Sequence, residues 1–189
     1  MRHKYETRGI VLTRSPVGEI NATVALMTPD FGLVYARAQG LRRSGAKLSA
    51  ALVTLAESEL TLVRGIEQWR VTGAVLKENW FLRIKDTAAR SRAVRVCGLF
   101  LRLYAGEMNG SEFFEIIRGF FEALAVLPEA SHEAVEVLAV LRLLATLGLD
   151  AGEIPGKMSE YTPSVLEDAI KNRADYIARI NKGISASGL

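Results

Sequence analysis

The spacing of apolar residues along this chain changes once, near Trp80, and that change restricts the folds that the chain can adopt. Before Trp80, short runs of alternating apolar and polar residues are separated by Gly and Pro turns, the pattern of β-strands. From Trp80 onward, apolar residues recur every three or four positions, the pattern of amphipathic helices. We therefore expect an α+β protein, with a strand-rich domain over residues 1–80 and an all-α helical bundle over residues 81–189.

Five strands are predicted in the first part, with tight-turn sequences between them. Pro16 with Gly18 indicates one turn, and residues 29–32 (PDFG) indicate a hairpin. Closure into a small barrel is favoured, because it removes exposed strand edges. The expected architecture is a five-stranded OB-fold barrel, a common platform for single-stranded nucleic acid. The predicted strands are Tyr5–Leu12, Asn21–Thr28, Leu33–Ala38, Glu57–Arg64 and Gln68–Leu76.

Four helices are predicted in the second part, over residues 85–104, 111–127, 131–147 and 163–181. Asp86 or Thr87 is placed to cap the first helix, since a short polar side chain can accept from the free backbone N–H groups there. The third helix is apolar nearly all round, so we expect it to be the central helix of the bundle.

A cluster of cations without any carboxylate lies between the third and fourth predicted strands. Gly40 and Gly45 bracket its densest part, and glycine readily adopts turn conformations, so an exposed loop is expected. Such a loop suits the phosphate backbone of a nucleic acid, whereas the alternative is a solvated hairpin tip kept soluble by its charges. The cations are Arg37, Arg42, Arg43 and Lys47.

Four aromatic residues of the strand-rich part are candidates for stacking on nucleic acid bases, and each can equally be a core residue. They are Tyr5, Phe31, Tyr35 and Trp69.

Charge is unevenly distributed along the chain. Residues 1–80 carry 11 Lys or Arg against 7 Asp or Glu, and residues 107–168 carry 12 acidic groups against 3 basic ones. This distribution favours a polyanion as partner of the first part.

Apolar stretches are all shorter than a membrane span and the start lacks a secretory signal, so we expect a cytoplasmic protein with no membrane contact. Cys97 is the only cysteine, which excludes a cysteine-rich zinc site.

Catalytic patterns are scarce. Neither His3 nor His132 has a partner at metal-ligand or catalytic spacing. The spacing of Glu129, Glu133 and Glu136 places them on one helix face, which is compatible with the metal site of a two-metal nuclease. A solvated helix face is the simpler explanation. We expect a binding module rather than an enzyme, with no catalytic residues, no metal and no cofactor.

The order of the motifs resembles that of the bacterial recombination mediator RecO family. The matching positions of the first domain are Gly18-Glu19, Thr28 with Gly32, and Gly40 followed by Arg42, Arg43 and Lys47. Residues 113–124 and 140–156 resemble the helices of the family's second domain and the Leu-Gly turn that ends them. Many family members then continue into a four-cysteine zinc-binding insertion. This chain has only residues 150–162 there, so it resembles a short member without zinc.

The resemblance implies a role in DNA repair and homologous recombination. Family members bind single-stranded and double-stranded DNA, anneal complementary strands, and assist loading of the recombinase on DNA covered by single-strand-binding protein. The implied partners are RecR and the acidic C-terminal tail of single-strand-binding protein. A groove for that tail is expected from Phe100, Arg102, Leu103 and Arg118, with core packing as the alternative. The alternative function is a protein-interaction adaptor, in which the acidic bundle binds partners and the barrel is a scaffold.

Overall fold

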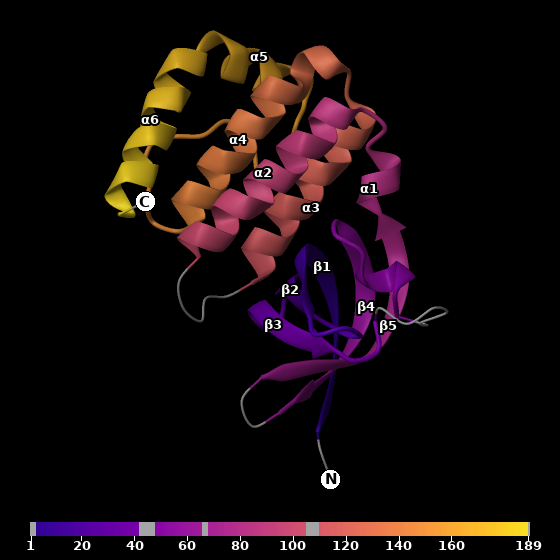
Figure 1. The fold of residues 1–189 in the computed structure, drawn as a ribbon. Coiled ribbons are helices and arrows are strands. Elements are labelled where there is room, and N and C mark those ends of the chain that lie inside the picture. Colours follow the sequence, from indigo (N-terminus) through magenta and orange to yellow (C-terminus); the bar gives the residue numbers. More distant parts are fainter. Residues whose placement is uncertain (1–2, 42–47, 66–67, 105–109, 189) are drawn as a thin grey trace. The chain divides into compact units, whose positions relative to one another are not determined.

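The computed structural model describes residues 3–41, 48–65, 68–104 and 110–188. The chain forms two compact units, which Figure 1 shows as a strand-rich part and a helical part. The first unit comprises Met1–Arg83 with Glu107–Phe114, and the second comprises Ile84–Gly106 with Glu115–Leu189. The division into domains at residue 80, expected from the sequence, stays a prediction.

The first unit is a closed barrel whose strands run in the order β1-β2-β3-β5-β4. Neighbouring strands are antiparallel except for β3 and β5, which run parallel over three residue pairs. This arrangement confirms the predicted five-stranded OB-fold barrel in the described part of the chain. The strands are β1 (Lys4–Val17), β2 (Asn21–Thr28), β3 (Gly32–Ala38), β4 (Ala56–Arg64) and β5 (Trp69–Asn79).

Alternate residues of each strand fill the barrel. Val24 and Leu26 of β2, Val34 of β3, and Leu60 and Leu62 of β4 belong to one buried apolar cluster. Successive strand residues point to opposite faces, so the residues between these positions lie on the outside. The 3-10 helix η1 (Ala50–Leu52) contacts β4 and β5, and the short helix α1 (Trp80–Arg83) follows β5.

Strand β1 is longer than its sequence pattern predicts. The predicted end of the first strand at Leu12 was wrong, because β1 continues to Val17; the turn indicated by Gly18 is present and begins at that residue, whose φ is 62°. Pro16 pairs with Ala22 near the end of the ladder, where a residue without an N–H is tolerated. A register shift between Val11 and Thr13 accompanies the extension.

The second unit is helical and is built around α4. Eleven residues of α4 are buried, and this helix contacts α2, α5 and α6 (Figure 1), which confirms the predicted central helix. Asp86 caps α2 by accepting a hydrogen bond from the Ala89 backbone N–H at 2.6 Å, as expected. The helices are α2 (Thr87–Leu103), α3 (Ser111–Val126, which begins in the first unit), the 3-10 helix η2 (Glu129–Ser131), α4 (His132–Thr146), α5 (Pro163–Lys171) and α6 (Arg173–Ala186).

The single helix predicted over residues 163–181 is two helices. Asn172 separates α5 from α6, and its side-chain amide donates to the Asp168 carboxylate at 2.9 Å. Asn is poorly suited to a helix interior because its side chain competes for local hydrogen bonds. The Tyr176 hydroxyl also donates to Asp168, at 2.6 Å, which fixes the corner between the two helices.

Two arginines hold the segment between α4 and α5. Arg142 of α4 is 5% exposed and donates to the backbone carbonyls of Pro155, Met158 and Glu160 at 2.7–3.2 Å. Arg179 of α6 donates to the Asp150 carboxylate and to the Glu153 carbonyl. The hydrogen bond from Arg179 lowers the pKa of Asp150. Residues 150–162, where the family resemblance implied a zinc site in other members, are thus fixed by guanidinium groups.

We expect Arg142→Met to lower the free energy of unfolding by about 2 to 4 kcal/mol, because the buried Arg142 side chain makes hydrogen bonds to three backbone carbonyls that lose their donor. The measurement is urea denaturation followed by circular dichroism. Arg173→Met is the matched control: Arg173 pairs with Glu133 on an exposed surface, so its loss should cost less than about 1 kcal/mol. Equal losses for the two variants would contradict the role assigned to Arg142.

Candidate nucleic-acid interface

Two arginines lie side by side where the barrel closes. Arg37 of β3 pairs with Arg70 of β5 in the parallel register. Their neighbours Ala36, Ala38 and Val71 belong to the buried core cluster, so both arginines project from the outer face. Neighbouring strands are about 4.8 Å apart, which brings the two positive charges close together.

Among the described residues, no acidic group pairs with either of these arginines. The cross-strand neighbours of Arg37 are Thr23 and Arg70, and the other neighbour of Arg70 is Val63. Within the described residues, neither arginine forms an ion pair, and the covered Nε atom of each lacks a hydrogen-bond acceptor. Like charges opposite each other on a sheet repel, so this face is stabilised by an anion. A phosphate, which guanidinium groups bind well, has the required charge.

The densest part of the predicted basic loop, with Arg42, Arg43 and Lys47, lies outside the described residues. The positions on either side are well fixed: Leu41 belongs to the barrel core, and Leu48 packs against it. The Gly40 backbone N–H donates to the Asn21 side chain at 3.0 Å, and Gly40 has a positive φ of 66°. Arg37 precedes this stretch on β3, so it lies near the start of the loop.

The four aromatic candidates have different environments. Tyr5, Phe31 and Trp69 pack on one another, with ring centroids 5.3–5.5 Å apart, and cover the core cluster. Tyr35 stands on the outer face of β3, two residues before Arg37, and is 52% exposed. Tyr35 is thus the most exposed of these four residues, with about half of its surface open to solvent.

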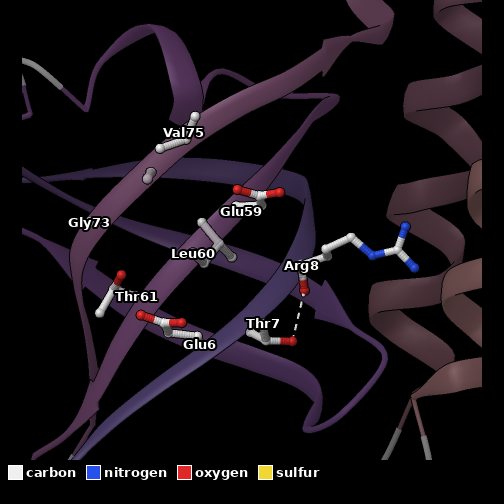
Figure 2. Close-up of a pocket in the computed structure, with 9 residues that line it drawn as sticks. Glu6, Thr7, Arg8, Glu59, Leu60, Thr61, Gly73 and Val75 are labelled. Atoms are coloured by element: carbon white, nitrogen blue, oxygen red, sulfur yellow. Dashed lines mark hydrogen bonds between the residues drawn. The ribbon is translucent and has the colours of Figure 1, made fainter.

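The outer face of β1, β4 and β5 carries charges of both signs. It carries a hollow of about 440 Å³, lined by two carboxylates, Glu6 and Glu59 (Figure 2). The hollow forms where Gly73 lacks a side chain beside Thr61. Arg8 extends away from both carboxylates in Figure 2, and its guanidinium lies 5.2 Å from the centre of the Phe114 ring. Glu59 is paired with Lys77 at 2.8 Å, so the charges of this face are at least partly compensated, and the β3–β5 side is the stronger candidate for an anion.

The four residues expected to form a partner groove lie in the helical unit. Phe100 is fully buried and Leu103 is 9% exposed, whereas Arg102 is exposed and Arg118 is half-buried. The groove stays a prediction.

Two of the three acidic residues considered for metal catalysis are engaged in ion pairs. Glu136 binds Arg92 and Arg95, and Glu133 binds Arg173. The described residues contain no group of three side chains suited to hold a metal ion.

Burial raises the pKa of the Cys97 thiol to about 12, so this thiol is protonated and unreactive at neutral pH.

Sequence reasoning did not single out Arg70. The alternation of Trp69, Arg70 and Val71 indicates that Arg70 faces outward. Its position beside Arg37 depends on the pairing of β3 with β5, which lie 30 residues apart in the chain and are joined only by barrel closure.

Known proteins are similar to this chain in sequence. Residues 1–79 match the family model described as "Recombination protein O N terminal". A protein from Dehalococcoides mccartyi, named DNA repair protein RecO, is 31% identical over 123 residues, which cover 65% of this chain and 48% of that protein. Proteins of the same name from Nostoc sp. and Heliobacterium modesticaldum are 27% and 29% identical, each over 79% of this chain and over 51% and 56% of their own lengths.

The chain is therefore similar to RecO proteins over the barrel, and the similarity extends beyond residue 79 into the helical part. It spans about half the length of the RecO proteins that it matches. The family model covers the whole barrel, including Arg37, Tyr35 and Arg70. None of the helices in the described ranges is long and apolar enough to cross a membrane.

We expect Trp69→Ala to lower the free energy of unfolding by about 2 to 3 kcal/mol, because the ring packs against Tyr5, Phe31 and the barrel core. Tyr35→Ala should change it by less than about 0.5 kcal/mol, since Tyr35 is exposed. Urea denaturation measures both. A Trp69 variant as stable as the parent protein would show that Trp69 is not part of the packing.

Proposed function

We propose that this protein is a member of the RecO family, a DNA repair and recombination mediator that binds single-stranded and double-stranded DNA through its barrel. The observation that carries the proposal is the pair Arg37 and Arg70, two adjacent cations without an acidic partner in the described part of the barrel. Each guanidinium can hold a phosphate, and phosphates are common to both forms of DNA. Arg42, Arg43 and Lys47 of the neighbouring loop extend the same contact.

The finer function follows from the family. We propose that the protein anneals complementary strands and assists recombinase loading on DNA covered by single-strand-binding protein, acting in the cytoplasm without chemistry of its own. Its partners are RecR and the acidic tail of single-strand-binding protein, with Arg102 and Arg118 of the helical unit as cations for that tail. Contact with phosphates positions DNA without reading bases, which suits a protein that must act on any damaged sequence.

Arg37→Ala combined with Arg70→Ala should weaken binding to a labelled oligonucleotide roughly tenfold or more at low salt, because two charged hydrogen-bonding groups are lost. A salt titration by fluorescence anisotropy measures a second effect. Each phosphate contact to single-stranded DNA contributes about 0.7 to the slope of log affinity against log salt, so the double variant should lose about 1.4.

Lys77→Ala is the matched control for this measurement. Lys77 lies on the same strand as Arg70 and carries the same charge, but it is 2.8 Å from the Glu59 carboxylate. Its removal should leave affinity and salt slope nearly unchanged. If Lys77→Ala and the double arginine variant were equally impaired, net charge rather than the paired arginines would explain binding. Capture of protein partners without any DNA affinity would favour the adaptor function.

A further inference from the structure

Among the described residues, Tyr35 forms no contact with another aromatic ring and no side-chain hydrogen bond. Its strand neighbours Val34 and Ala36 face the core, and its ring is 52% exposed on the outer face. The residue opposite it on β2 is Ala25, which presents only a methyl group. Tyr35 takes part in neither the aromatic cluster at Trp69 nor any hydrogen bond between described side chains. Ala25 is itself covered, at 1% exposed, and about half of the Tyr35 surface remains open to solvent.

This ring lies on the same side of the sheet as the arginine pair. Tyr35 and Arg37 are two residues apart on β3, so their Cα atoms are separated by roughly 7 Å along the strand. Arg70 lies one strand further, opposite Arg37. The three side chains therefore form a short row that begins with an aromatic face and ends with two cations. Proteins that hold single-stranded nucleic acid combine these two elements, a ring for the base and cations for the backbone.

We infer that Tyr35, Arg37 and Arg70 form a subsite for one unpaired nucleotide, whose base stacks on the Tyr35 ring and whose phosphate is held by the two arginines. The inference rests on the proposed function, namely that the barrel binds DNA. It adds a specificity: the arginines act on both forms of DNA, and Tyr35 acts on single strands alone. In a duplex both faces of each base are already stacked on neighbouring bases, so none is free to cover the ring.

The other aromatic candidates of the barrel are less open to a base. Tyr5, Phe31 and Trp69 pack on one another and against the core cluster, so moving one of them onto a base would uncover buried apolar surface. The acidic hollow beside Glu6 and Glu59 also offers no aromatic side chain among its lining residues. Tyr35 is therefore the residue through which the described part of the barrel can distinguish an unpaired base from a paired one.

The test compares three DNA probes and two variants of the full chain. The probes are a thymidine oligonucleotide, an oligonucleotide of the same length whose central positions are abasic, and a blunt duplex. Tyr35→Leu removes the aromatic face and keeps an apolar side chain, whereas Tyr35→Phe keeps the face and removes only the hydroxyl. Because Tyr35 is exposed, both variants should fold, and urea denaturation checks this.

We expect Tyr35→Leu to bind the thymidine oligonucleotide about tenfold more weakly than the parent protein and the duplex equally well. Tyr35→Phe should bind all three probes as the parent does. The parent should prefer the thymidine probe over the abasic one, and Tyr35→Leu should bind both alike, because only the parent has a ring on which a base can stack.

Three results would overturn the inference: unchanged binding of the thymidine probe by Tyr35→Leu, an equal loss on the thymidine probe and the duplex, or a Tyr35→Phe variant as weak as Tyr35→Leu. These differ from failure of the proposed function, in which the parent protein itself binds none of the probes in a salt-dependent manner.

Discussion

The first unit depends on a short contact, the three parallel residue pairs by which β3 meets β5. The other strand pairs of the barrel are longer and antiparallel, so this contact alone joins the two ends of the sheet into a closed barrel. Closure leaves no long free edge at this seam and buries Ala36, Ala38 and Val71. It also sets Arg37 next to Arg70, although two cations side by side repel. The same constraint therefore closes the barrel and creates the pair of cations that we propose to bind phosphate.

The two outer faces of the barrel differ in how their charges are paired. The seam of β3 and β5 carries cations without acidic partners in the described residues, while on the β1, β4 and β5 face Glu59 is paired with Lys77. If the barrel binds a polyanion as proposed, the uncompensated charge of the seam favours that face. A bound phosphate would then offset the repulsion between the two arginines.

Much of this architecture could be predicted from the sequence, because each element has a local signal. Alternation and turn residues located the strands, and Asp86 was recognisable as a helix cap. Two element boundaries were predicted wrongly. The first strand continues through Pro16, which is tolerated at the end of the ladder, and the helix predicted over residues 163–181 is interrupted at Asn172, which bonds to Asp168. Arg70 was missed because its role depends on a pairing between distant strands. Alternation alone could not tell the exposed Tyr35 from the packed Trp69.

The most direct measurement of the central claim is nuclear magnetic resonance of the arginine side chains while a thymidine oligonucleotide is added. The Nε–H signals of individual arginines report which guanidinium groups meet phosphate. We predict that the signals of Arg37 and Arg70 shift together with DNA concentration, while those of Arg83 and Arg173, which are ion-paired to Glu78 and Glu133, stay in place. Shifts confined to arginines of the helical unit, with Arg37 and Arg70 unchanged, would contradict the account.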